Sequence, residues 1–396
     1  MTGLAVVPAE PAARQDASRI PVDWPIVGPL GASLICLPIS RAATSLAWMA
    51  LAAVMVWRAT RRELRIPREM TFGIACWLIT WAISIGGSPD PLGTARAWWA
   101  AASMAVPVLA VGARRDHGPL PRVVEAVWIT STLLLGVWVV VELRLGLHWL
   151  SGRYGRLSYP MMPNPNTAAQ YLLLLFAWAF AGALGGRRAS WWRHLAWVGA
   201  AALLAATLTR AVWPAYVVVA GFCSWRARRP IMGLAAAAAF LAGNWILPWS
   251  LWARATEPGV TNSVQFLGRL QGWVVALRMF AWRPFTGEGL GAWRQAYAVL
   301  RSPGFPVAWP HAHQFYLHVL AEAGFLGLLG FGVFLLWTFR SVWRRGWRGP
   351  DALPEELGMT AALLGTALVA LVDMTWVGEP GYAFLALAAF ALGRRG

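Results

Sequence analysis

The chain has 396 residues, of which 58% are hydrophobic and 13% are charged, and its formal net charge is +17. A water-soluble protein of this length needs a more highly charged surface, so the composition excludes a soluble fold. Apolar blocks close to the ~20 residues that cross a bilayer recur along the chain, which predicts an all-α, polytopic integral membrane protein.

The basic residues are interpreted as markers of membrane topology rather than as contacts to nucleic acid. All 34 of them are Arg, and they cluster between the apolar blocks. Positive charge next to a span resists translocation, so these clusters are predicted to be cytoplasmic. They are residues 58–69, 113–122, 185–194, 225–230 and 340–351, together with the C-terminal "RRG".

Residues 1–23 are predicted to be a short cytoplasmic tail, because they lack the charged-then-apolar layout of a signal peptide. Residues 24–396 are predicted to form one membrane domain. Two spans fit between successive basic clusters, which predicts about twelve transmembrane helices. Residues 26–57 and the short spans within 195–248 are the hardest to delimit.

The remaining loops are predicted to face the periplasm or the cell exterior. Most are short, residues 143–167 form one of middle length, and about residues 249–312 form a long one. A loop of that length with its own helical pattern is usually functional, so we expect the active groups there.

Several polar residues fall on this outward side and are the candidate site residues. They are Asn164 and Asn166 in "MPNPNTAAQ", Arg210 in "ATLTRAVWP", Arg269 and Arg278 in an amphipathic part of the long loop, His311 and His313 at its end, and Asp373 near the last outer turn.

Each candidate also has a structural interpretation. Arg210 could extend its guanidinium to the membrane interface, and the asparagines could cap a helix. Arg269 and Arg278 could contact lipid headgroups, while Asp373 could simply pair with an Arg. His318 lies roughly 140° around a helix from His313 and is interpreted as interfacial packing.

His313 is the candidate that packing explains least well. On a continuous helix, Gly324 and Gly327 return to within roughly 40° of its face. Small residues on one stripe let a neighbouring helix approach closely. This spacing predicts that one helix stripe packs inside the bundle and directs His313 at its outer mouth.

The chemistry follows from what is present outside the inner membrane. ATP is absent there, so a transferase needs a donor that carries its own leaving group, such as a lipid-linked sugar diphosphate. The chain has only 17 acidic residues and no DxD pair, which disfavours an oxygen-ligand metal site. Arg forks suit phosphate oxygens. The residues therefore favour a diphosphate site without metal or cofactor, with His313 as the proton acceptor.

Four motifs resemble those of the O-antigen ligase and polymerase superfamily. "HQFYLHVLAEAGFLG" is similar to the ligase signature, with His313, Gln314, Gly324 and Gly327 at the expected positions. Three further stretches, "GRLQGWVVALRMFAWRPFTGEGLGAW", "GRYGRLSYPMMPNPNTAA" and "ATLTRA", resemble other conserved parts of the superfamily. The resemblance covers about residues 150–340.

The resemblance implies a C-type membrane glycosyltransferase that is inverting and independent of metal. Such an enzyme transfers a glycan from undecaprenyl diphosphate to the lipid A-core oligosaccharide at the periplasmic face of the bacterial inner membrane. By this resemblance Arg210 and Arg269 bind the diphosphate, His313 activates or orients the acceptor, and Gln314 supports the ring. Arg278 and His311 are weaker candidates.

Three alternatives remain open at this stage. A polymerase or a protein O-oligosaccharyltransferase of the same superfamily would share the donor chemistry and differ in the acceptor. A lipid-linked substrate transporter would need ionisable groups near the bilayer midplane and repeated broken helices, and the sequence shows neither. The expected partners are the donor, the acceptor and membrane lipids, and the chain is expected to act as a monomer.

Overall fold

The computed structural model describes most of the chain. The described residues are 22–63, 68–113, 121–147, 156–160, 162–185, 191–243, 260–303, 309–347, 354–376 and 378–392. The predicted tail therefore lies outside them up to residue 21, as do the C-terminal "RRG" and parts of the loops 143–167 and 249–312.

The described chain is helical, and its single β-bridge, between Tyr159 and Met162, is isolated. The helices are α1 (Trp24–Cys36), α2 (Arg41–Thr60), α3 (Arg68–Gly87), α4 (Pro91–Ser103), α5 (Ala105–Ala113), α6 (Arg122–Leu145), α7 (Pro165–Leu184), α8 (Trp191–Ala206), η3 (Arg210–Val212), α9 (Trp213–Arg226), α10 (Pro230–Gly243), α12 (Val260–Trp282), α13 (Trp293–Leu300), α14 (Phe315–Gly346), α15 (Pro354–Val369) and α16 (Gly378–Leu392). The all-α prediction is confirmed for the described chain.

Four of the described helices are long and apolar enough to cross a bilayer, which supports a membrane protein. They are Ala42–Thr60, Arg122–Leu145, Pro165–Leu184 and Phe315–Trp337, and shorter apolar helices accompany them. Each predicted internal basic cluster lies at or beside a junction between two helices. With α4 and α5 counted together, two α-helices lie in each interval outside residues 230–340, whereas that interval contains α10, α12, α13 and α14 among the described residues. In the interval before residue 113, α4 and α5 follow each other with a break at Met104.

Three helices, α2, α4 and α7, begin with a polar cap. Ser40 accepts a hydrogen bond from Ala43 N at 3.3 Å at the start of α2. Asp90 precedes Pro91 at the start of α4, and Asn164 precedes Pro165 at the start of α7. A short polar side chain satisfies a free N–H of the first turn, and the Pro ring already has a helical φ.

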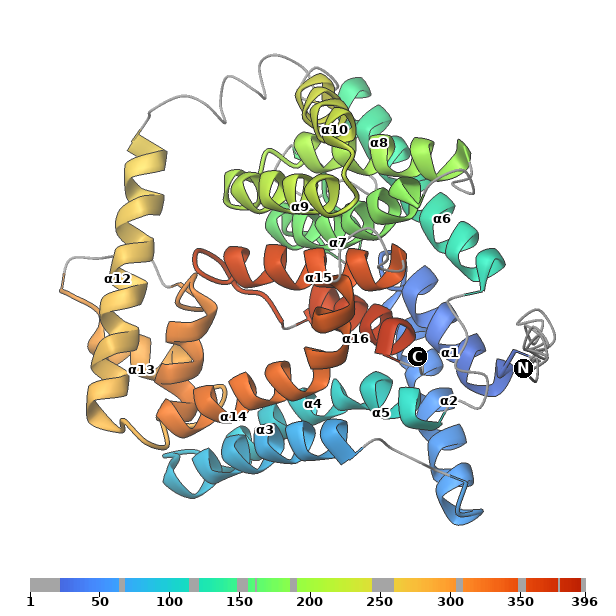
Figure 1. Cartoon of the computed structure of the whole chain (residues 1–396). Coiled ribbons are helices and arrows are strands. Elements are labelled where there is room, and N and C mark those ends of the chain that lie inside the picture. The colour runs from blue at the N-terminus through green and yellow to red at the C-terminus, as the bar shows by residue number, and fades with distance from the viewer. Residues whose placement is uncertain are drawn as a thin grey trace, which may run out of the picture.

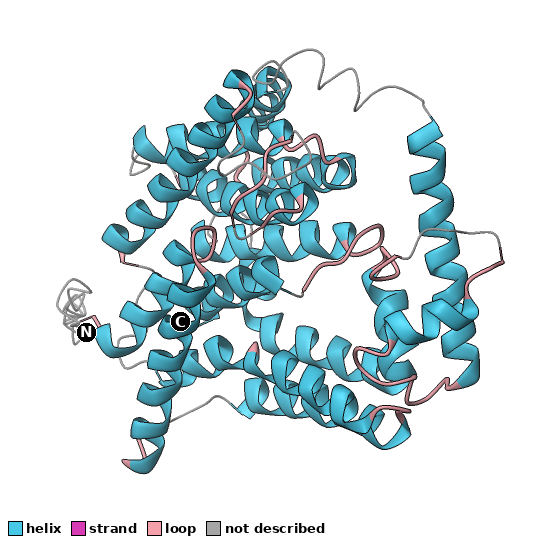
Figure 2. Cartoon of the chain, turned by 180° about the vertical axis from the view of Figure 1, so that it is seen from behind, coloured by secondary structure: helices cyan, strands magenta, loops and turns pink. Residues whose placement is uncertain are grey.

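The buried centre of the fold is α7, whose side chains from Ala168 to Leu184 are all buried. Figure 1 shows α8, α9 and α10 grouped with α7 on one side of α15, and α3, α4 and α14 on the other. α15 packs against α7 and α9, and α14 lies along α3. Figure 2 shows the same two groups from behind.

The long outer segment folds against this bundle. α12 lies beside α14 and α13. A second, smaller apolar core holds these elements together, formed by Val275, Ala276, Met279, Trp293, Tyr297, Ala312 and Ala321. The long loop thus forms a packed layer rather than a tether.

The prediction of one continuous helix stripe from His313 to Gly327 is wrong. His313 precedes the helix, with φ of 52°, and α14 is interrupted at Gly324, whose φ is 68° and ψ −171°. Angular spacing along a helix has no meaning across such a break. Gly327 does allow close packing, because its carbonyl oxygen accepts a hydrogen bond from Trp81 Nε1 on α3 at 3.1 Å.

The break in α14 receives the loop that follows α12. Phe325 N donates to Pro284 O at 2.8 Å, and Glu288 N donates to Ala321 O at 3.0 Å. A Cβ on Gly324 would lie 2.4 Å from the backbone of Phe285. Glycine is required here both by its positive φ and by this close approach of backbone to backbone.

Candidate functional site

His313 lies in the turn immediately before α14 and is 8% exposed. Three contacts fix this turn. Phe315 N donates to Ala370 O at 2.9 Å, Leu317 N donates to the side-chain oxygen of Gln314, and His313 N donates to His311 Nδ1 at 3.2 Å. A left-handed residue other than glycine persists only where its surroundings hold it. The imidazole is therefore rigidly placed.

Asp373 faces this imidazole from the turn between α15 and α16. Its Oδ1 atom lies 3.6 Å from His313 Nδ1, and the carboxylate is 4% exposed. Oδ1 also accepts from Met374 N at 2.8 Å, and Oδ2 accepts from Asn166 Nδ2 at 2.8 Å. A buried carboxylate held in this way favours the tautomer with a proton on Nδ1. The Nε2 atom is then the free acceptor.

Arg269 lies over the same turn, because α12 passes close to the segment that carries the histidines. A Cβ on Gly268 would lie 2.3 Å from the Trp309 ring, and one on Gly272 would lie 3.2 Å from Ala312 O. Arg269 Nη1 donates to Val372 O at 2.9 Å, next to Asp373 in sequence. The rest of its guanidinium fork remains available for a ligand.

Arg210 begins η3, directly after the turn that ends α8. Its side chain is exposed, and it has no hydrogen-bond or ion-pair partner among the residues that the structure describes. Its close neighbour is Arg156, which the sequence interpretation did not select as a site residue. Arg156 Nε donates to Thr207 O at 2.7 Å and Nη2 donates to Thr209 Oγ1 at 2.9 Å. Arg156 is the last residue of "GRYGR", and this motif in the sequence could have identified it as a candidate.

Hydrogen bonds link Arg156 to the residues around His313. Thr209, which holds Arg156, also donates to Asn166 Oδ1 at 3.4 Å, and Asn166 in turn contacts Asp373. A polar path therefore runs from the Arg156 and Arg210 pair to His313. It joins the starts of η3, α7 and α14 with the turn before α16.

Three groups have shifted pKa values that fit this arrangement. Burial alone would raise the pKa of Asp373, but the nearby His313, the hydrogen bond from Met374 N and the Arg269 charge lower it. Burial and the neighbouring His313 lower the pKa of His311 to about 3, so this ring is neutral. Burial and the adjacent Arg210 lower the pKa of Arg156 to about 10, which leaves it cationic at neutral pH.

Two predicted residues do not reach this cluster. Arg278 is exposed and donates to Leu300 O at 2.7 Å. It lies nine residues after Arg269, which is half a turn out of phase on a helix and therefore on the opposite face. Asn164 accepts from Asn166 N at 2.9 Å and acts as the cap of α7. This hydrogen bond agrees with the interpretation of Asn164 as a helix cap.

His318 belongs to a separate group under the outer loop. Its Nε2 atom lies 3.5 Å from Glu322 Oε2, and its ring contacts Trp293 with centroids 5.1 Å apart. Glu322 Oε1 also accepts from Trp293 N at 3.0 Å, and Trp293 Nε1 donates to Trp309 O at 2.9 Å. These contacts hold α13 and the segment before His313 against α14.

Within the described residues, no group of three or more His, Cys, Asp or Glu side chains has a geometry suited to a metal ion. The polar path instead begins at the guanidinium of Arg156, which has Arg210 as a neighbour, and Arg269 lies next to its other end. Planar guanidinium forks bind phosphate oxygens in pairs. The arrangement can therefore bind an anionic phosphate group next to a histidine that has a free ring nitrogen.

Comparison with known proteins places part of this site in a family. Residues 195–332 match the sequence model of the family described as O-Antigen ligase. The matched stretch contains Arg210, Arg269 and His313, whereas Arg156, Asn166 and Asp373 lie outside it. No curated protein matches the chain. The similarity of this membrane protein to the O-antigen ligase family therefore lies in residues 195–332, about a third of the chain.

Proposed function

We propose that this protein is an O-antigen ligase. In this proposal it transfers a glycan from undecaprenyl diphosphate to a hydroxyl of the lipid A-core oligosaccharide, at the periplasmic face of the bacterial inner membrane. The observation that carries the proposal is the buried His313 and Asp373 pair beside Arg269. The family match to residues 195–332 supports a lipid-linked glycan donor.

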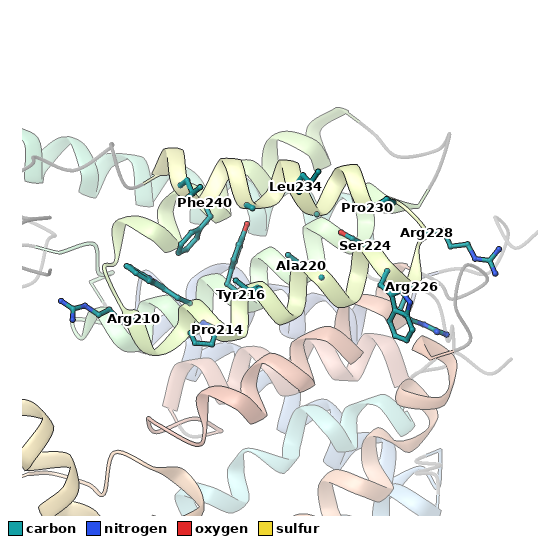
Figure 3. A pocket seen from close by; sticks show the side chains of 17 residues that line it. Arg210, Pro214, Tyr216, Ala220, Ser224, Arg226, Arg228, Pro230, Leu234 and Phe240 are labelled. Atoms are coloured by element: carbon teal, nitrogen blue, oxygen red, sulfur yellow. The ribbon is translucent and has the colours of Figure 1, made fainter.

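The proposed topology is the predicted one of about twelve spans with the basic clusters inside. The pairs of α-helices in five of the six intervals support this count, with α4 and α5 acting as one broken span, and α10 and α14 are the proposed spans of the interval 230–340. Figure 3 supports the orientation, because Arg210 lies at one end of the α9 and α10 pair, and Arg226 and Arg228 lie at the other. The fold class that we propose is the C-type glycosyltransferase fold.

The proposed reaction is a single inverting displacement. The acceptor hydroxyl attacks the anomeric carbon, the bond from that carbon to the diphosphate oxygen breaks, and the electron pair leaves on the diphosphate. The hydroxyl proton goes to His313 Nε2, and Asp373 stabilises the resulting imidazolium through Nδ1. Arg210 and Arg269 offset the charge that develops on the diphosphate. The described side chains at this site supply guanidinium groups and no group of His, Cys, Asp or Glu suited to a metal ion, which supports a mechanism independent of metal.

Reconstitution of the full chain in lipid vesicles tests this function. Undecaprenyl diphosphate-linked glycan is supplied with lipid A-core in one reaction, and with a second lipid-linked glycan in another. We expect a lipid A-core product that carries the glycan. A lengthened polyprenyl-linked glycan without that product would instead identify a polymerase and overturn the proposal.

A further inference from the structure

The nitrogen of His313 that would accept the proton is covered in this structure. Both ring nitrogens, Nδ1 and Nε2, are buried and have no hydrogen-bond partner among the described residues. Nδ1 faces Asp373 at 3.6 Å. In the proposed reaction the acceptor hydroxyl gives its proton to Nε2, and proton transfer needs the two heavy atoms within about 3 Å of each other. Part of the cover must therefore move before the acceptor reaches this nitrogen.

Two aromatic rings contact the His313 imidazole. The Trp309 indole meets it edge-on with ring centroids 4.8 Å apart, and the His311 ring lies 4.1 Å away. His311 is held in place, because its Nδ1 atom accepts a hydrogen bond from His313 N at 3.2 Å. The Trp309 Nε1–H is buried and has no partner within the part of the chain that the structure describes. The indole is therefore the part of the cover that no side-chain hydrogen bond retains.

The indole lies against the backbone of α12 at Gly268. A Cβ at this position would lie 2.3 Å from Trp309 Nε1 and 2.4 Å from Cε2 and Cζ2 of the same ring. Carbonyl groups inside a helix already accept hydrogen bonds from the next turn, so this surface offers no ready acceptor to the indole N–H. The missing side chain of Gly268 gives the indole its place beside His313.

The unpaired N–H makes this position of the indole costly. A buried donor without a partner has lost its hydrogen bond to water, which costs free energy. An indole that rotates away from α12 regains a partner in water or in a sugar hydroxyl. The backbone need not follow, because Trp309 O accepts from Trp293 Nε1 at 2.9 Å, and Glu322 Oε1 accepts from Trp293 N at 3.0 Å. The Trp309 side chain can therefore turn on a fixed backbone.

We propose that Trp309 is a cover over His313 Nε2 that turns aside for the acceptor and otherwise keeps water from this nitrogen. The inference rests on the proposed function, because it concerns the choice of nucleophile at that site. Trp309 would then be a specificity-determining residue that favours transfer over hydrolysis. Sites that close in this way protect reactive groups from water.

The reaction that the cover prevents is hydrolysis of the donor. A water oxygen would bond to the anomeric carbon in place of the acceptor hydroxyl, and a water proton would pass to His313 Nε2. The bond from that carbon to the diphosphate oxygen would break, and the electron pair would leave on the diphosphate. The products would be free glycan and undecaprenyl diphosphate, so the donor would be lost without transfer.

Two substitutions open the cover in different ways. Trp309→Ala removes the indole, whereas Gly268→Ala keeps the indole and places a Cβ where its ring lies. Ala is a better helix former than Gly, so the second change does not weaken α12 itself. Gly332→Ala on α14 is the matched control, because Gly332 is an exposed helical glycine whose Cβ would meet no atom within 4 Å.

Chemical labelling of the histidines tests the cover without any glycan transfer. The full chain in lipid vesicles is treated with diethyl pyrocarbonate, which acylates accessible unprotonated imidazoles, and the rate at each histidine is followed by mass spectrometry. We expect His313 to react slowly in wild type and in Gly332→Ala. In Trp309→Ala and Gly268→Ala it should react at least about tenfold faster, equivalent to about 1.4 kcal/mol. Equal rates at His313 in all four proteins would overturn the inference.

His318 is the internal control for this measurement. It packs against Trp293 in the same outer layer, with ring centroids 5.1 Å apart. We expect its rate of labelling to be the same in all four proteins, because the cover lies over His313 alone. A rise at His318 that matches the rise at His313 would mean that Trp309 merely holds the layer together, and it would overturn the inference.

Hydrolysis of the donor tests the consequence of opening. Undecaprenyl diphosphate-linked glycan is supplied without acceptor and the release of free glycan is measured, with transfer to lipid A-core measured in parallel. We expect the ratio of hydrolysis to transfer to rise about tenfold in Trp309→Ala and Gly268→Ala, and to stay unchanged in Gly332→Ala. An unchanged ratio in all variants would overturn the inference even if transfer is observed. Labelling of His313 that depends on Trp309, in a protein that neither transfers nor hydrolyses the donor, would overturn only the proposed function.

Discussion

Asn166 donates a hydrogen bond to Asp373 Oδ2 across 2.8 Å, although 207 positions separate the two residues in the sequence. The other oxygen of the same carboxylate faces His313. Asn166 therefore orients the carboxylate that orients the imidazole, and α7 is coupled to the turn before α14. Predictions about the site follow from this relationship.

Replacement of Asp373 by Asn should slow transfer while leaving donor binding almost intact. An amide cannot stabilise the imidazolium, and it also removes the preference for a proton on Nδ1. We expect kcat to fall about 10²-fold or more, within the range of general base catalysis, with little change in KM for the donor. Initial rates over a range of donor concentrations measure both constants. An unchanged kcat would exclude Asp373 from the chemistry.

Replacement of His313 by Asn separates its chemical role from its backbone conformation. Asn tolerates the left-handed region better than Ala does, so the turn before α14 should keep its shape. We expect transfer to fall by about 10²-fold or more, with an unfolding temperature closer to wild type than that of His313→Ala. His194→Asn on α8 is the matched control and should keep its activity. Retained transfer in His313→Asn would remove the imidazole from the reaction.

Substitution of Arg156 tests the residue that the sequence interpretation missed. Arg156→Ala removes one of two adjacent cations, and a hydrogen bond to a charged group contributes about 1.5–3 kcal/mol. We expect KM for the undecaprenyl donor to rise at least about tenfold. Arg156→Lys should recover little, because Lys lacks the fork that reaches both Thr207 O and Thr209 Oγ1. Arg228→Ala, at the end of the α9 and α10 pair opposite to Arg210, should leave KM unchanged.

Substitution of Gly324 tests the break in α14. Gly324→Ala introduces a Cβ 2.4 Å from the Phe285 backbone and a residue that disfavours positive φ. We expect the free energy of unfolding to fall by at least about 2 kcal/mol. Gly332→Ala on the same helix meets open space and should not destabilise the protein. Thermal unfolding in detergent compares them, and equal midpoints would contradict the described break.

Acidification should destabilise the protein through His311. Its pKa is about 3 in the folded chain, below its ordinary value of 6.5, so the unfolded chain binds a proton first as the pH falls. Stability from this group is therefore present above pH 6.5 and is lost between about pH 6.5 and 3. His311→Gln should lose less stability than wild type between pH 7 and 5 in thermal unfolding. Parallel losses in both proteins would contradict the assignment.

The sequence by itself determined the class of the molecule and much of its order along the chain. Composition and the spacing of Arg clusters predict a membrane protein with two apolar helices between clusters. The described helices follow that order outside residues 230–340 when α4 and α5 are counted together, whereas that interval contains four helices. Residue types and motifs also selected Arg269, His313 and Asp373, which the structure brings together. These properties depend on local composition and spacing, which a single chain displays directly.

The tertiary structure alone decided which candidates share a site. It brings Asn166 to Asp373, adds Arg156, and leaves Arg278 on the opposite face of α12 from Arg269. It also converts the predicted helix stripe into a break at Gly324. Such contacts arise from packing between segments far apart in sequence. Helical periodicity carries no information about which distant segment will pack against a given helix, as the Phe285 backbone does at Gly324.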